Sequence, residues 1–342
     1  MFKQFTAFIF FLISVIGSGF VHFIRSEPVK SLHTLTGKAQ GTTYTIKYIH
    51  ASAIVDIIAI QQILSEIDQS LSLYLPTSLI TQFNKSSRGV NTDVHLSNVV
   101  RKSLLVSTAS QGCFDITIKP ILMLWGFNAA TPKSIPSLAL LQKTSKVVGY
   151  HHLSFNRDSL VKDNPNTQID CDGIAQGYTV DQLVLFIRNK GITDFMVEVG
   201  GEVFASGKNL AGRDWIIGIE GSDVYKGDDR FISNTISLSN MAVTTSGSMK
   251  KYQKLGNSYW SHIVDPRTAM PVDNGIVSVT VIAPDAITAD AYDNAFMVMG
   301  VNQAFALANS IKDMGLYIVY ANKYGTVSDT SNLCFKQFLI HQ

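Results

Sequence analysis

Hydrophobic residues recur along the chain with two periods, and the longer period predicts helices. In residues 53–74 the apolar side chains are spaced by about 3.6 positions, which predicts an amphipathic helix. Three further segments that end at glycine also predict helices: 96–112, 181–191 and 288–300. Thr288 is the expected N-cap of the last one, because its hydroxyl can accept a hydrogen bond from a free N–H at the helix start.

Alternating or continuous apolar runs predict strands in other parts of the chain. The expected strands are 41–49, two strands joined by a tight turn within 194–207, and then 213–221, 274–283 and 316–322. Helices and strands do not follow one another in a regular βαβ order. This favours an α+β fold with a mainly antiparallel sheet over a doubly wound parallel sheet.

The N-terminal segment is distinguished by a long apolar run. Lys3 precedes the uncharged run Phe5–Ile24, which is the layout of a secretory signal. The run is also long enough to span a bilayer if it is retained. We therefore expect residues 1–30 to be a signal peptide or a membrane anchor, and residues 31–342 to form one large domain. The first cysteine is Cys113, which argues against a lipoprotein anchor at this end.

Composition and charge narrow the classes of function. The chain is 46% hydrophobic and 16% charged, which suits a large core and excludes a disordered chain. The net charge is only +2 and there is no run of Lys or Arg, so we expect no nucleic-acid partner. Cys113, Cys171 and Cys334 are widely spaced and indicate neither a disulfide framework nor a zinc site.

Three oxygen-bearing side chains share one face of the helix predicted over 288–300. Asp290, Asp293 and Asn294 are spaced i, i+3 and i+4, beside a run of Ala, Phe, Met and Val. Burying such groups unpaired is costly, and hard divalent cations such as Mg²⁺ take ligands of this kind. The alternative is an acidic first turn that interacts with the helix dipole. The pattern alone leaves both interpretations open.

Several turns that contain glycine carry polar residues suited to a phosphate ligand. The segment "QIDCDGIAQGYTVDQL" (168–183) passes through Gly173 into a helix start, where free N–H groups can bind phosphate. It is neither a P-loop nor a dinucleotide fingerprint, and a plain turn is the alternative. The segments "EVGGEV" (198–203) and "TTSGS" (244–248) leave the same choice, and a hairpin turn is the simpler interpretation of the first.

The segment "WSHIVDPRTAMPV" (260–272) combines a histidine with a rigid turn. Asp265-Pro266 predicts a turn, and His262 and Arg267 flank it. Histidine is the side chain best suited to acid–base chemistry near neutral pH. A lone histidine near a turn is more often structural, so this segment depends on the rest of the chain for its interpretation.

The order of the motifs resembles that of a known family. The chain contains, in sequence, "GTTYTIKY", "SLYLPTSLITQFN", "GCFDITIKPILMLWGF", "IDCDGIAQGYTVD", "VEVGGEV", "TTSGS", "SHIVDPRT" and "TADAYDNAFMVMG". This order closely resembles the ApbE family of FAD:protein FMN transferases, over about residues 38–320. The resemblance implies Mg²⁺-dependent transfer of FMN from FAD to a Ser or Thr of a target protein through a phosphoester bond, with release of AMP.

The resemblance also implies which residues form the site. It places magnesium on the backbone carbonyl of Gly173 and on Asp290, Asp293 and Asn294. It makes His262 the essential histidine, so His262 and Asp290 are the expected catalytic residues. The implied FAD contacts are Gln40, Cys113, Phe114, Asp115, Asp170, Gln176 and Val264.

Partners and location follow from the same resemblance. Targets of the family are subunits of membrane redox complexes and other exported flavoproteins, which places the reaction on the periplasmic side of the inner membrane. The lipoprotein cysteine common in the family is missing, so residues 1–30 are the expected membrane link, either retained or cleaved.

The chain departs from the family pattern at several positions. Many relatives have Met at Gln40, Ala at Cys113, Lys or Glu at Gln176, Thr at Asn294 and Gly at Ala269. Asn294 still offers an oxygen ligand, whereas Gln176 removes a charge. Two other functions use the same residues: an FAD pyrophosphatase that gives FMN and AMP, and an exported FAD-binding protein without turnover. The sequence does not separate the transferase from the pyrophosphatase.

Overall fold

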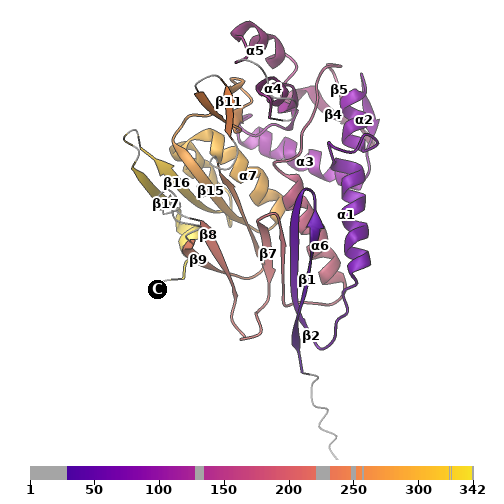
Figure 1. Ribbon diagram of the computed structural model, residues 1–342, viewed down its shortest axis with the longest axis vertical. Helices are drawn as coiled ribbons and strands as arrows, with labels where there is room; N and C mark the ends of the chain where they lie inside the picture. The colour runs from indigo at the N-terminus through magenta and orange to yellow at the C-terminus, as the bar shows by residue number, and fades with distance from the viewer. Residues whose placement is uncertain are drawn as a thin grey trace, which may run out of the picture.

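An eight-stranded antiparallel sheet forms the centre of the molecule (Figure 1). The structure is a computed structural model, and it describes residues 29–127, 135–220, 232–247, 252–255, 258–322, 324 and 326–340. In spatial order the strands are β1 (Ser31–Ala39), β2 (Thr42–His50), β6 (Phe195–Val199), β7 (Glu202–Ser206), β10 (Met241–Gly247), β15 (Ile276–Ala283), β16 (Gly315–Ala321) and β17 (Val327–Ser331). Each neighbouring pair is antiparallel, which confirms the predicted α+β class.

The main hydrophobic core lies between this sheet and a layer of helices. The helices that contribute to it are α1 (Ile57–Leu71), α2 (Leu79–Lys85), α3 (Val94–Ala109), α6 (Ala175–Asn189), α7 (Ala286–Met299) and α8 (Val301–Ser310). Strand β16 shows why its sequence is a continuous apolar run. Leu316 and Ile318 enter this core, while Tyr317 and Val319 enter a second cluster, because successive strand residues point to opposite faces.

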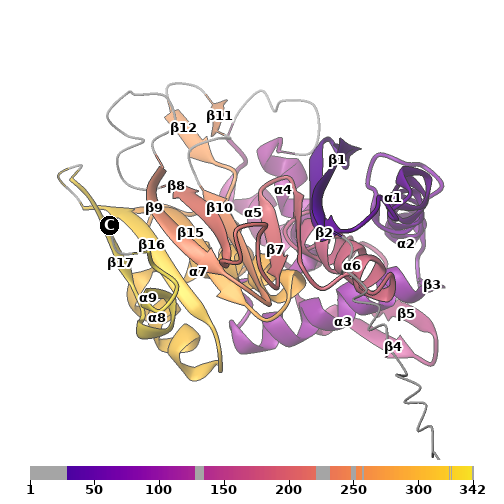
Figure 2. The same ribbon diagram turned by 90° about the horizontal axis from the view of Figure 1, so that it is seen from below.

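The second cluster is closed by a hairpin. Strands β8 (Trp215–Glu220) and β9 (Ile232–Leu238) pair with each other and contribute Trp215 and Ile236 to it. The short helix α9 (Leu333–Lys336) adds Phe335, whose ring stacks on Tyr317. Both faces of the sheet are therefore covered, and Figure 2 shows the hairpin and the helix layer along the sheet.

Smaller elements surround the end of the sheet where α4 and α5 lie. They are η1 (Ile116–Ile118), α4 (Lys119–Trp125), α5 (Leu138–Ser145), η2 (Tyr150–His152), the sheet β3 (Gly89–Asn91), β5 (Ser159–Lys162) and β4 (Leu153–Asn156), and the pairs β11 (Tyr252–Leu255) with β12 (Ser258–Ser261) and β13 (Val264–Asp265) with β14 (Met270–Pro271). A third apolar cluster joins α4 to the β13–β14 turn. In it, the indole Nε1 of Trp125 donates to the carbonyl of Ala269 at 2.9 Å.

Two helix starts differ from the predictions. Helix α7 begins at Ala286 and its N-cap is Asp285, whose carboxylate accepts from the N–H of Thr288, so the prediction of Thr288 as N-cap is wrong. Asp290 therefore lies in the second turn rather than the first. Helix α6 begins at Ala175, before the predicted residue 181, because packing on α7 overrides the low helix propensity of Gly177.

Residues 1–28 lie outside the described ranges, so the predicted signal or anchor lies outside them as well. Within the described ranges, none of the helices combines the length and the apolar character that a membrane span requires.

Candidate active site

A cleft of about 680 Å³ lies where the α4 segment, the start of α6, strand β7 and helix α7 meet. Most of the residues predicted from the sequence line it, although they come from distant parts of the chain. They are Cys113, Phe114, Asp115, Asp170, Gly173, Gln176, His262, Val264, Asp290 and Asn294. The sequence shows only the order of these motifs along the chain, whereas the fold brings them together around one cleft.

Two predicted residues lie outside the lining of the cleft. Asp293 is 1% exposed and lies directly behind it, where its Oδ1 accepts from the Asn294 amide at 3.0 Å. Gln40 occupies the β1–β2 turn with a φ of 51°, and its amide donates to the Thr179 hydroxyl of α6 at 2.7 Å. The role of Gln40 as an FAD contact stays a prediction.

Helices α6 and α7 cap each other at the cleft. The two carboxylate oxygens of Asp181, on α6, accept from the N–H groups of Ala286 and Ile287 at the start of α7, at 2.8 and 2.9 Å. In return, Asp290 of α7 accepts from the N–H of Gly177 in the first turn of α6 at 2.8 Å. This satisfies donors that a helix start leaves free and fixes Asp290 relative to Gly173. The N–H of Gly177, in the helix start that the sequence offers as a possible phosphate site, is therefore hydrogen-bonded to Asp290.

Gly177 is required by the close approach of these helices. A Cβ at this position would lie 2.3 Å from the Ala286 carbonyl oxygen and 2.7 Å from the Asp290 Cβ. We expect Gly177→Ala to lower the stability by about 2 kcal/mol or more, because a clash with backbone forces the helices apart. Thermal unfolding measures this as a fall in Tm of at least about 4 °C. The control Asn189→Ala, at the exposed end of α6, should change Tm little, and an unchanged Tm in Gly177→Ala would contradict the close packing.

Oxygen atoms converge around the Asn294 amide. Its Nδ2 lies 3.3 Å from the Gly173 carbonyl oxygen, 3.4 Å from Asp290 Oδ1 and 3.0 Å from Asp293 Oδ1. An amide presents either nitrogen or oxygen in the same place when it turns about its last bond, so Asn294 can join this set as an oxygen donor. Two carboxylates, a carbonyl and an amide oxygen are ligands that Mg²⁺ accepts. The residues therefore fit the predicted cation.

The set contains only two carboxylates. Among the residues that the structure describes, no group of three or more His, Cys, Asp or Glu side chains is arranged to hold a metal ion. A cation at Asn294 would depend on the Gly173 carbonyl and the amide as well as on the two acids.

The carboxylates of the cleft are held in their neutral form more readily than free acids. Burial, with smaller contributions from the charges of Asp181 and Asp172, raises the pKa of Asp290 to about 7, while the hydrogen bond from the Gly177 N–H opposes the shift. Burial, followed by the charge of Asp290, raises the pKa of Asp293 well above its usual range. Two neighbouring anions in a buried site need a cation or a proton between them.

We expect the metal-free protein to lose stability as the pH rises. Asp290 has a folded pKa of about 7 against an ordinary value of 3.8, so the folded state holds a proton that the unfolded state releases. The stabilisation is complete below about pH 4 and is lost as the pH rises through 7. The Tm of the metal-free protein should therefore fall by several degrees between pH 5 and 8, and Mg²⁺ should restore more of it at pH 8. A Tm independent of pH, or a larger Mg²⁺ effect at pH 5, would contradict this.

The loop that carries His262 is fixed by its own charged residues. Asp265 accepts from Arg267 Nε at 3.0 Å and from Nη2 at 2.8 Å, so the arginine pairs within the turn. Ala269 has a φ of 60°, in the left-handed region that favours glycine. The rigid turn holds His262 and Val264 against the cleft.

The acids at the other wall are engaged in local structure. Asp115 accepts from the Thr117 N–H at 2.8 Å and hydroxyl at 2.6 Å, and from the Tyr150 N–H at 2.6 Å. Burial raises the pKa of Asp115, and these hydrogen bonds oppose the shift. Asp170 accepts from the N–H of Asp172 at 2.9 Å. These side chains shape the wall of the cleft by holding its backbone.

Sequence reasoning missed two residues near the cleft. A hairpin turn is the simpler interpretation of the sequence around Glu202, yet this residue is 8% exposed and lines the cleft. Tyr74 is 85% exposed, and the negative charge of Asp172, a lining residue, is the first cause that raises its pKa. The only signal for Tyr74 was an aromatic residue that precedes the proline of the motif "SLYLPTS".

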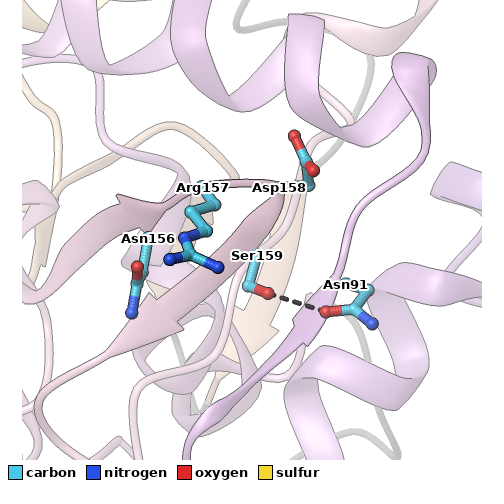
Figure 3. A pocket seen from close by; sticks show the side chains of 5 residues that line it. All are labelled: Asn91, Asn156, Arg157, Asp158 and Ser159. Carbon is cyan, nitrogen blue, oxygen red and sulfur yellow. Dashed lines mark hydrogen bonds between the residues drawn. The ribbon is translucent and has the colours of Figure 1, made fainter.

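Another hollow, at the turn between β4 and β5, has a different character. It has a volume of about 560 Å³ and is lined by Asn91, Asn156, Arg157, Asp158 and Ser159 (Figure 3). The Ser159 hydroxyl donates to the Asn91 side chain at 2.7 Å, and Arg157 forms the turn with a φ of 53°. None of the predicted site residues lies in it, so we interpret it as a solvated turn.

A cleft that joins a histidine to buried carboxylates suits the acid–base chemistry of an enzyme, and comparison with known proteins identifies the family. The sequence profile of the ApbE family matches residues 40–318. The FAD:protein FMN transferase of Vibrio cholerae serotype O1 is 32% identical over 320 residues, which cover 92% of this chain and 94% of that protein. The protein of the same name from Escherichia coli K12 is 31% identical over 335 residues, 93% of each chain. The solved structure of the flavin transferase ApbE from Vibrio cholerae has a TM-score of 0.81 at 31% identity, and covers 91% of this chain and 100% of that chain. The chain belongs to the ApbE family.

Proposed function

We propose that this protein transfers FMN from FAD to a Ser or Thr hydroxyl of another protein, in a Mg²⁺-dependent reaction that releases AMP. The observation that carries the proposal is the cleft itself. It unites His262 with Asp290 and Asn294, in a chain whose relatives are named FAD:protein FMN transferases. Its volume of about 680 Å³ suits a ligand of this size.

The two walls of the cleft suit the two chemical halves of the substrate. Ile118, Leu122 and Phe127 form an apolar wall, which fits the flavin rings. The exposed ring of Tyr74 offers a flat aromatic surface beside Asp172. Gly173, Asp290 and Asn294 lie on the polar side, where the pyrophosphate would bind.

The proposed reaction exchanges one bond at phosphorus. The acceptor hydroxyl oxygen forms a bond to the phosphorus that carries riboflavin, and the bond from this phosphorus to the AMP oxygen breaks. The hydroxyl proton passes to His262, which has a suitable intrinsic pKa and lines the cleft. Asp290 and the β13–β14 turn hold the reacting groups in place, and positioning of this kind supplies much of the catalysis in phosphoryl transfer.

Mg²⁺ is part of this proposal. The residues that would hold it are Asp290, Asp293, Asn294 and the Gly173 carbonyl, whose oxygens converge as described above. When bound, the cation neutralises the pyrophosphate oxygens and makes AMP a better leaving group.

We further propose that the protein acts on the periplasmic side of the inner membrane. The support is the apolar run Phe5–Ile24 after Lys3 in the predicted signal or anchor, residues 1–30. The expected acceptors are flavoprotein subunits of membrane redox complexes. Fractionation of cells, followed by N-terminal sequencing of the protein, distinguishes a retained anchor from a cleaved signal.

The direct test is the mass of an acceptor. The purified protein is incubated with FAD, Mg²⁺ and an acceptor domain that carries a Ser/Asp-Gly-Ala-Thr type motif, and the intact mass of the acceptor is measured. A gain of one FMN group that EDTA prevents supports the transferase. An unchanged acceptor with accumulating AMP indicates the FAD pyrophosphatase. An unchanged acceptor with intact FAD, repeated over several acceptors, indicates a binding protein without turnover.

A further inference from the structure

Glu202 has a buried oxygen that lacks a partner. The residue begins β7 directly after the Gly200-Gly201 turn, and its side chain lines the cleft at 8% exposure. One carboxylate oxygen is stabilised by the N–H of Glu202 itself. The other, Oε2, has no hydrogen-bond partner among the described residues. Because a buried acceptor without a donor is costly, a donor is expected to enter with a ligand.

The charges around Glu202 limit what this donor can be. After burial, the charge of Asp290 is the next cause that raises the pKa of Glu202, to about 8, and Glu198 adds to it. Glu202 in turn raises the pKa of Asp293. A cation bound at Asp290 would favour the ionised form of Glu202. To this form a phosphate oxygen has no proton to donate, and it would add another negative charge. The donor must be an O–H or N–H group, or water polarised by a cation.

Water bound to Mg²⁺ satisfies both requirements. Mg²⁺ prefers octahedral coordination and keeps several of its waters in proteins, so the proposed set of protein ligands leaves room for them. Such waters donate strongly to nearby carboxylates, and partners of this kind orient a metal site.

We propose that Glu202 is a positioning residue of the cation site, in which its Oε2 accepts a hydrogen bond from a water molecule bound to Mg²⁺. The inference rests on the proposed Mg²⁺-dependent function and extends it, because Glu202 is outside the predicted ligand set. It gives strand β7 a part in holding the cation, opposite helix α7.

Glu198 provides a matched control from the same hairpin. Its Oε1 accepts from the Gly201 N–H at 2.9 Å, and the residue is not among those that line the cleft. Glu198→Gln therefore removes a nearby negative charge while it leaves the cleft lining unchanged.

The test compares Mg²⁺ binding in full-length variants without FAD, by isothermal titration calorimetry. Glu202→Leu removes the acceptor and should weaken Mg²⁺ binding by about 10- to 100-fold. Glu202→Gln keeps an acceptor oxygen without the charge and should lose less. Glu198→Gln should stay close to the unmodified protein. The Tm of metal-free Glu202→Leu should not fall, because the change removes an unpaired buried carboxylate, and this reports that the variant is folded.

Each other outcome has a defined meaning. Equal losses in Glu202→Leu and Glu202→Gln would overturn the hydrogen bond, because charge alone would then explain them. An unchanged Mg²⁺ affinity with weaker FAD binding would overturn the inference in favour of a substrate hydroxyl as the donor. If the unmodified protein bound no Mg²⁺, the cation part of the proposed function would fail as well, so the two failures are distinguishable.

Discussion

Replacing Asp290 by asparagine is expected to reduce Mg²⁺-dependent AMP release from FAD by a factor on the order of 10² to 10³, the usual cost of removing a group that stabilises charge at the reacting centre. In the unmodified protein the Gly177 N–H donates to the Asp290 carboxylate at 2.8 Å. The amide of asparagine keeps an oxygen that can accept this hydrogen bond, so the start of α6 stays capped. Only the charge and the cation ligand are lost. AMP release is measured by chromatography at saturating FAD.

Two comparisons separate the chemical effect of Asp290 from a structural one. Asp290→Ala should also abolish turnover. In addition, it leaves the buried Gly177 N–H without its acceptor, which should lower the free energy of unfolding by about 1 to 3 kcal/mol. Asp329→Asn, on the exposed part of β17, is the control for loss of a carboxylate and should be as active as the unmodified protein. An Asp290→Asn variant with full Mg²⁺-dependent activity would remove Asp290 from the proposed site.

Replacing His262 by alanine is expected to abolish FMN transfer while FAD still binds. A positioned acid or base contributes about 10²- to 10⁴-fold to the rate, so the loss should fall in this range. Binding should survive because the substitution leaves the residues of the apolar wall and of the carboxylate side of the cleft in place. Transfer is measured by the acceptor mass and binding by flavin fluorescence.

The control for His262 is a histidine elsewhere on the molecule. His50 is the last residue of β2, and its ring forms a hydrogen bond with the Ser52 backbone. It is not among the residues that line the cleft, so His50→Gln should leave transfer unchanged. Full transfer by His262→Ala would show that the acid–base assignment is wrong. Loss of FAD binding together with transfer would instead show that His262 holds the substrate.

The parts of the fold that sequence could predict are those fixed by local geometry. Asp290 and Asn294 share a face because i, i+4 spacing on a helix leaves no other arrangement, and the structure places both at the cleft. The helix of residues 57–71 follows from its apolar period alone. His262 could be selected because a histidine before a rigid Asp-Pro turn is unusual inside an apolar segment.

The parts that could not be predicted depend on contacts between distant segments. Every residue of β7 is buried, so its pattern has no alternation to show that Glu202 faces the cleft. The early start of α6 depends on the fit of Gly177 against Ala286, which lies far along the chain. Tyr74 comes close to Asp172 only after folding. Only the resemblance of the motif order to a known family indicated that these distant residues belong to one site, because local patterns do not show which segments meet.

The mutual capping of α6 and α7 ties the chemistry of the protein to its folding. Asp181 and Asp290 each complete the first turn of the opposite helix, so neither turn is finished until both helices have docked. Formation of the two turns is therefore one cooperative event, and it is the same event that assembles the carboxylate side of the cleft. A chain that had drifted away from catalysis could replace Asp290 without loss of the helix cap only by a residue that still accepts from the Gly177 N–H, such as asparagine, so selection for a stable fold alone would help to preserve an acceptor at this position.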